Sequence, residues 1–156
     1  MIVPSNLLVR KNAGGEEPAP TPFWHETNWD LTSSGINDAG GVWETPTTLA
    51  FNSYSGNANT ILFEYKDTGV PESVGKALSL TIEFQDTSGE VVYRLFNVDD
   101  GTASPDSYFY PDSSGDPITV VSQPMSNSDI KGVALFNNFG ASLPFKIVDA
   151  ALVDVE

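Results

Sequence analysis

The chain carries a single histidine, His25, and this residue limits the catalytic chemistry that the sequence could support. A Ser-His-Asp arrangement would have to use His25, with Glu26 or Asp30 orienting its ring, and no Gly-x-Ser-x-Gly nucleophile turn occurs. A lone histidine beside Glu26 is more often a hydrogen-bonded surface residue than a base. A carboxylate pair for glycoside cleavage stays open, although domains of this size seldom form the deep cleft that such a pair needs. We therefore expect a binding protein rather than an enzyme.

Large aromatic side chains gather in the first third of the chain, and they suit either a core or a ligand. Trp24, Trp29 and Trp43 have flat faces that pack well inside a sandwich or against the C–H face of a sugar. Polar residues flank Trp24 and Trp29, so one of these two rings could face a ligand. Trp is highly buried on average, and we therefore favour the core for both rings while keeping them as candidate ligand-binding residues.

A second aromatic group, Tyr108, Phe109 and Tyr110, lies within a polar segment rich in Asp, Ser, Gly and Pro. Exposed aromatic residues beside Asp and Ser are typical of protein interfaces and of glycan-binding surfaces. The alternative is that the three rings pack against the edge of their own domain. We take these residues as candidates for binding a ligand or a partner chain.

Composition and charge narrow the classes of partner. The 156 residues suffice for one domain with a full hydrophobic core. Seven Lys and Arg residues stand against 21 Asp and Glu residues, and the formal charge of −14 disfavours nucleic acid and anionic membranes as partners. Cysteine is absent, which excludes disulfides and thiolate metal sites. No signal-peptide pattern follows Met1, and no segment approaches the roughly 20 apolar residues of a membrane span.

The elements that must position these residues are predicted to be β-strands. Apolar and polar side chains alternate over residues 78–84 and again over 91–95, and the four-residue loop Asp86–Gly89 between them predicts a hairpin. Similar short runs occur at Asn6–Arg10, Thr48–Tyr54, Thr60–Tyr65, Ile118–Ser122, Ile130–Asn137 and Phe145–Val155. About eight strands with long polar connections predict an all-β, antiparallel β-sandwich of the jelly-roll kind. Helix should be confined to a turn or two near Glu72–Lys76.

Long connections interrupt the strand pattern at three places. They are a Pro- and Gly-rich arm at about 13–22, the segment Ser33–Gly41, and a long loop at about 99–117. Connections of this length are usually either functional or disordered. The arm and the 99–117 loop show little apolar alternation that would anchor them to their own sheets. We therefore predict that both are contact surfaces for other chains.

The two ends of the sequence resemble a known family of jelly rolls. The strand-like segment Asn6–Val9 is followed by Gly14–Glu17 and then by the tryptophans, and the chain closes with Ile130–Asn137 and Phe145–Leu152. This series is similar to the opening and closing strands of galactose-binding-like domains, which include many carbohydrate-binding modules. The resemblance implies the sandwich fold more firmly than any ligand, because one sandwich hosts many unrelated sites.

The same resemblance implies one structural calcium ion. In the family, the ion lies between an early Glu turn and an Asp of the last strand, which correspond here to Glu16 or Glu17 and to Asp149. Calcium requires six to eight oxygen ligands, and acidic residues are plentiful. The chain departs from the family pattern at Val148, where a first Asp would stand, and it lacks the Phe before Glu16. A chain without any cofactor is therefore the alternative.

The function expected on these grounds is a non-catalytic structural or binding role. A fold that usually meets its ligands outside cells, in a chain that begins at Met1 without an export signal, favours a particle released by lysis. We expect a bacteriophage virion surface accessory protein, namely a capsid decoration or cement protein or a tail-associated protein. Its partners would be capsid or tail proteins, a homo-oligomer of the chain itself, and cell-surface glycans. The alternative is an extracellular carbohydrate-binding module of a polysaccharide-degrading system.

Overall fold

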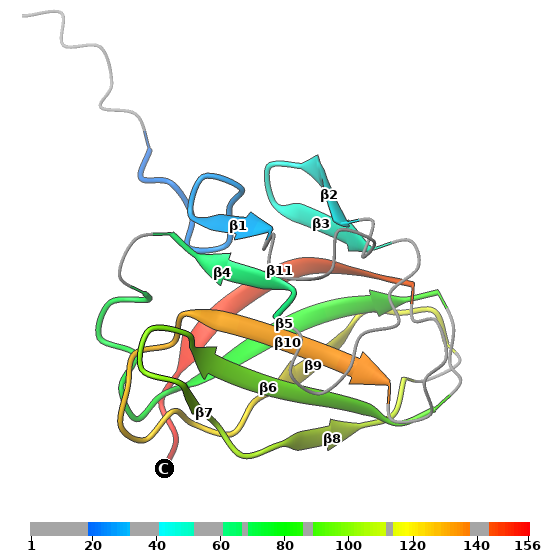
Figure 1. Ribbon diagram of the computed structural model, residues 1–156. Coiled ribbons are helices and arrows are strands. Elements are labelled where there is room, and N and C mark those ends of the chain that lie inside the picture. Colours follow the sequence, from blue (N-terminus) through cyan, green and yellow to red (C-terminus); the bar gives the residue numbers. More distant parts are fainter. Residues whose placement is uncertain are drawn as a thin grey trace, which may run out of the picture.

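The computed structural model shows two antiparallel β-sheets packed face to face as a sandwich (Figure 1). It describes residues 19–31, 41–51, 61–66, 69–85, 89–111, 114–137 and 144–156. The described residues contain no helix, and so none that is long and apolar enough to cross a membrane. The predicted all-β class is therefore confirmed.

Each sheet combines strands that are far apart in the sequence. Sheet A, with six strands, contains β1 (Trp29–Leu31), β4 (Phe63–Tyr65), β10 (Gly132–Asn137), β6 (Val91–Asn97), β7 (Thr102–Ala103) and β8 (Ser107–Phe109), of which β7 and β8 both pair with β6. Sheet B, with five strands, contains in order β2 (Gly41–Thr45), β3 (Thr48–Phe51), β11 (Phe145–Val153), β5 (Ala77–Phe84) and β9 (Ile118–Val121). In the view of Figure 1, sheet A lies in front of sheet B.

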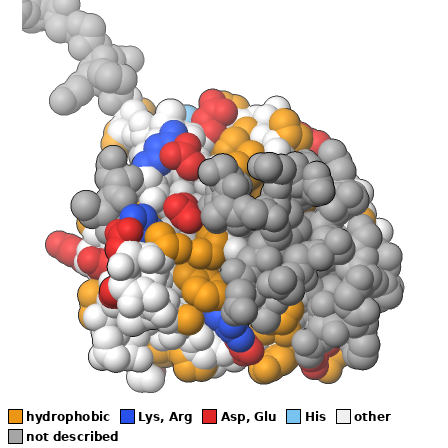
Figure 2. Space-filling model, in the orientation of Figure 1, with side chains coloured by type: hydrophobic (Ala, Val, Ile, Leu, Met, Phe, Trp, Pro, Cys, Tyr) orange, Lys and Arg blue, Asp and Glu red, His pale blue; other side chains and the backbone are white. Residues whose placement is uncertain are grey.

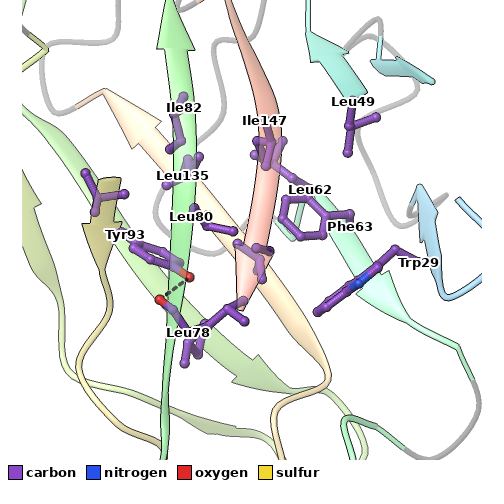
Figure 3. Packing of buried hydrophobic residues seen from close by; sticks show 14 of the residues in the cluster. Trp29, Leu49, Leu62, Phe63, Leu78, Leu80, Ile82, Tyr93, Leu135 and Ile147 are labelled. Atoms are coloured by element: carbon purple, nitrogen blue, oxygen red, sulfur yellow. Dashed lines mark hydrogen bonds between the residues drawn. The ribbon is translucent and has the colours of Figure 1, made fainter. Parts of the chain in front are cut away.

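The core lies between the two sheets and follows the alternation of β5. Leu78, Leu80 and Ile82 are fully buried, whereas the residues between them are only half-buried. From the facing sheet, Tyr93 and Leu95 of β6 are equally buried. The Tyr93 hydroxyl crosses the core and donates a hydrogen bond of 2.9 Å to the Leu78 carbonyl (Figure 3). The predicted core face of β5 is therefore confirmed.

The hairpin predicted between residues 78–84 and 91–95 is wrong. Strand β5 pairs with β11 and β9 in sheet B, whereas β6 pairs with β10, β7 and β8 in sheet A. The two strands face each other across the core instead of lying side by side. Alternation and a turn signal are local properties, and they are the same for a hairpin and for a connection that crosses between sheets.

Most other predicted strands correspond to observed ones. Elements β3, β4, β9, β10 and β11 lie within the runs predicted at Thr48–Tyr54, Thr60–Tyr65, Ile118–Ser122, Ile130–Asn137 and Phe145–Val155. The run Asn6–Arg10 lies outside the described residues. The sequence prediction missed the short strands β1, β2, β7 and β8.

The helical turn expected near Glu72–Lys76 is absent, and consecutive turns take its place. Glu72 has a φ of 57° and Gly75 a φ of 77°, which are left-handed values that do not continue a right-handed helix. The Gly75 amide donates to the Met125 carbonyl at 2.5 Å, so the segment is also tied to a distant part of the chain, in addition to the local bond from the Lys76 amide to the Ser73 carbonyl.

Candidate functional site

Trp24 and Trp29 are core residues, and this corrects their inclusion among the candidate ligand-binding residues. Their exposed fractions are 2% and 0%. Their ring centroids lie 5.7 Å apart, and the indole nitrogens donate to the carbonyls of Thr47 at 2.9 Å and of Phe23 at 3.1 Å. Both polar atoms are thus satisfied inside the fold, so these rings offer no surface to a ligand.

Tyr108 and Tyr110, by contrast, are the two most exposed large hydrophobic residues among the described part of the chain. Their exposed fractions are 58% and 69%. Tyr108 lies on β8 opposite Val92 of β6, and Tyr110 follows directly after β8. Alternate residues of an extended strand point to the same face and lie about 7 Å apart, so both rings stand side by side on the outer face of sheet A. We call this pair the tyrosine ridge.

The segment that carries the ridge is fastened to the domain by its own strands. Phe109 points inward, where its ring lies 5.7 Å from that of Phe84. The Ser107 hydroxyl accepts a hydrogen bond of 2.8 Å from the Gln123 amide, which joins β8 to the chain just beyond β9 of the other sheet. The expectation that the 99–117 loop lacks an internal anchor is therefore wrong, because β7 and β8 occupy part of it.

Each tyrosine hydroxyl of the ridge is bonded to a carboxylate. Tyr110 donates to Glu90 at 2.6 Å, and Tyr108 donates to Asp106 at 3.3 Å. The bond to Glu90 raises the pKa of Tyr110 above its usual value, because loss of the phenolic proton would place two negative charges together. The negative charge of Asp106 raises the pKa of Tyr108 in the same way. These bonds fix the direction in which the rings point.

Arg94 holds Asp106 in place. Its guanidinium donates two hydrogen bonds to the Asp106 carboxylate, from Nε at 2.5 Å and from Nη2 at 2.9 Å. This bonding lowers the pKa of Asp106 and raises the pKa of Arg94. The guanidinium also lies over the rings of Phe96 and Phe136, at 5.7 and 5.9 Å from their centroids. A chain of contacts thus runs from the sheet through Arg94 and Asp106 to Tyr108.

Buried apolar side chains lie next to the ridge on the outer side of sheet A. Val92 and Phe136 lie opposite each other in the pairing of β6 with β10, and both are buried although neither belongs to the core cluster between the sheets. In Figure 2, hydrophobic side chains gather in the middle of the part of this face that is described, with charged groups around them. The ridge therefore stands next to buried apolar side chains and carries carboxylates at its hydroxyl ends.

The predicted calcium site finds only part of its ligands in the described structure. Asp149 is exposed on β11, next to an irregularity in the pairing with β5. Glu16 and Glu17 lie outside the described residues. Among the described residues, no group of three or more His, Asp or Glu side chains is arranged to hold a metal ion. The calcium site stays a prediction.

His25 lies in a turn and its Nδ1 is 2.9 Å from the Thr27 hydroxyl. The Thr27 amide donates to the same nitrogen at 3.2 Å. These two local contacts are the hydrogen-bonded surface arrangement that the sequence favoured for this histidine.

Sequence reasoning missed the charged residues that orient the ridge. Arg94 is the only charged residue within the apolar strand β6, which is a signal that it has a specific partner. Asp106 precedes Tyr108 by two residues and so shares its face, as the period of a strand requires. Glu90 carries no comparable signal, because only the pairing of β6 with β8 brings it to Tyr110.

Comparison with protein-family models, with curated proteins and with solved structures finds no match to this chain. The fold and the site define a two-sheet antiparallel β-sandwich that presents an ordered tyrosine ridge on the outer face of one sheet.

Proposed function

We propose that this chain is a non-catalytic structural and binding protein of a virion surface, as a capsid decoration, cement or tail-associated protein, and that it binds its partner through the tyrosine ridge. The observation that carries the proposal is the exposure of two oriented tyrosine rings on the outer face of sheet A. Exposed aromatic residues at such places are typical of protein contact surfaces, because they bring large contact area with few rotamers to fix.

The charge of the chain is consistent with this setting. With 21 acidic against seven basic residues, the protein is repelled by nucleic acid, and a high net charge favours solubility. A surface accessory must stay soluble until it meets its binding site, and it must not attach to packaged or released nucleic acid. The charge therefore supports a role on the outside of a particle.

An extracellular carbohydrate-binding module is the second candidate, and one observation favours it. Two exposed tyrosine rings on alternate positions, with carboxylates at their hydroxyls, could stack on the C–H faces of sugar units and accept hydrogen bonds from the sugar hydroxyls. Aromatic stacking and hydrogen-bond acceptors of this kind are compatible with a glycan as well as with a protein. The two candidates therefore have to be separated by experiment.

The deciding experiment measures the assembly state and the glycan binding of the same preparation. Light scattering that shows an oligomer, together with a glycan array that shows no affinity, is the expected result for the virion protein. A monomer that binds a defined sugar tightly would instead establish the carbohydrate-binding module.

Matched double variants connect either result to the ridge. Tyr108→Ser with Tyr110→Ser should weaken assembly or ligand capture while leaving the melting temperature nearly unchanged. Val42→Ser with Val121→Ser is the control, because it removes two exposed apolar side chains from sheet B without changing the charge. Normal binding by the tyrosine variant, with a melting temperature many degrees lower, would show that the rings serve the stability of the domain and would refute the proposed site.

A further inference from the structure

We propose that the surface which docks on the tyrosine ridge is an Arg- or Lys-rich surface of a second type of subunit, because this chain has only seven basic residues against 21 acidic ones. This inference rests on the proposed function, because it names the chemistry of the partner that the ridge binds. It follows from the hydrogen-bond acceptors that the ridge presents, from its charge, and from the spacing of its two tyrosines along the chain.

The ridge offers hydrogen-bond acceptors to a partner. Each tyrosine hydroxyl uses its single hydrogen on a carboxylate, Tyr110 on Glu90 and Tyr108 on Asp106. What the hydroxyl can still do is accept, and a carboxylate only accepts. A partner that pairs with these groups must therefore bring N–H or O–H donors.

The negative charge of the ridge favours cationic donors over neutral ones. The ridge combines the carboxylates of Glu90 and Asp106 with the one guanidinium of Arg94, within a chain of formal charge −14. Such a surface attracts Arg and Lys over long distances and repels anionic ligands. A neutral sugar would gain nothing from this field. Charge complementarity thus favours a basic protein surface over a glycan.

The exposed ring faces suit the same partner. A guanidinium stacks favourably on an aromatic ring, and Arg94 already does so on Phe96 and Phe136 on this face of sheet A. Tyr108 and Tyr110 are two positions apart along the chain, and alternate residues of an extended partner segment repeat at the same backbone spacing of about 7 Å. Two basic side chains of such a segment could therefore each meet one ring.

The test uses the full chain, three peptides of equal length and a panel of neutral oligosaccharides. In the first peptide Gly alternates with Arg, in the second with Gln and in the third with Glu. Binding is measured by calorimetry at low and at physiological salt. The Arg peptide should bind and the Gln and Glu peptides should not. The affinity should fall with salt, since the contact depends on charge.

Two variants with the same change in charge distinguish binding at the ridge from non-specific attraction of the Arg peptide to an acidic protein. Glu90→Gln removes a carboxylate at the ridge, whereas Glu44→Gln removes one that is bonded to Lys146 on sheet B. We expect Glu90→Gln to weaken binding of the Arg peptide about tenfold, which corresponds to one charge-assisted contact, and Glu44→Gln to weaken it less than about twofold. Tyr108→Ser with Tyr110→Ser should abolish the difference between the two Gln variants.

Equal weakening by Glu90→Gln and Glu44→Gln would refute the inference, since the peptide would then follow overall charge alone. Binding of an oligosaccharide that is lost in the double tyrosine variant would also refute it and would assign the ridge to a glycan. If no peptide binds the folded chain but the double tyrosine variant still alters assembly in light scattering, the basic partner is wrong and the proposed function stands. If that variant leaves assembly unchanged as well, both are wrong.

Discussion

At the scale of single residues, the candidate site depends on how charged groups are paired. Two tyrosines, two carboxylates and one arginine form the contacts that orient the ridge. None of these residues is unusual by type, and the property that distinguishes them is their mutual placement at the outer face of sheet A. Substitutions that change one charge at a time can therefore test each contact separately.

The bond between Tyr110 and Glu90 should be visible in the titration of the tyrosine. Glu90→Gln removes the negative charge that opposes ionisation, so the pKa of Tyr110 should fall toward its usual value of about 10. The pKa of Tyr108 should change much less, because Asp106 is the main cause of its shift. A titration followed by NMR of the two rings measures both, and an unchanged Tyr110 would show that its hydroxyl does not meet Glu90 in solution.

The pair of Arg94 and Asp106 should contribute stability that depends on pH. Because the fold lowers the pKa of Asp106, this contribution is present above the unfolded value of about 3.9 and is lost as the pH falls through the folded value. Arg94→Met should cost about 1–3 kcal/mol at pH 7, since it leaves a half-buried carboxylate without its two guanidinium donors. In urea denaturation, the difference from the wild-type protein should shrink below pH 4.

Lys76→Met is the matched control for this experiment. Lys76 pairs with Asp154, whose side chain is highly exposed, and exposed ion pairs contribute little to stability. If Lys76→Met lowers the free energy of unfolding as much as Arg94→Met does, the observed effect reflects the overall charge rather than the pair with Asp106.

At the scale of elements, strand β5 holds the core together. It is paired on both sides in sheet B and places Leu78, Leu80, Ile82 and Phe84 against sheet A. Its polar residues lie on the outer face, where Thr81 meets Thr119 at 3.2 Å. The strand therefore offers both sensitive and tolerant positions within a few residues of each other.

Leu80→Ala and Ile82→Ala should each destabilise the domain by about 2–5 kcal/mol, because each leaves a cavity where a fully buried side chain stood. Thr81→Ala, on the opposite face of the same strand, should cost less than about 1 kcal/mol. Thermal or urea denaturation of the three variants tests the register. If Thr81→Ala were the more damaging change, the face assigned to the core would be the outer one.

At the scale of the whole molecule, the net charge of −14 leaves the protein with strong self-repulsion, which bound cations would reduce. The repulsion between carboxylates bears on the predicted calcium site, because a bound calcium ion would reduce it. The exposed carboxylate of Asp149 on β11 is the only described residue of the three proposed ligands.

If calcium binds as the sequence implies, calcium should raise the melting temperature and a chelator should reverse the change, because a ligand of the native state stabilises it by mass action. Asp149→Asn should remove this response. Asp116→Asn, which removes one charge from another exposed position, should retain it. Identical melting curves with calcium and with chelator would leave the acidic residues as ordinary solvated groups.

The sequence by itself determined which face of a strand is buried. The alternation at Leu78, Leu80 and Ile82 predicts the core face of β5 because a strand has a period of two residues, and this period is local. The same reasoning, together with the turn-forming connections, predicted an all-β sandwich. This reasoning could not assign faces to Tyr108, Phe109 and Tyr110, because a run of aromatic residues shows no contrast between the two faces of a strand.

Only the tertiary structure decided which strands are neighbours. It placed β5 and β6 in different sheets, it buried Trp24 and Trp29 against each other, and it brought Glu90 to Tyr110. These contacts join positions whose separation in the sequence carries no information about their separation in space. Strand pairing depends on how whole faces pack together, so the candidate site appeared only when both sheets were assembled.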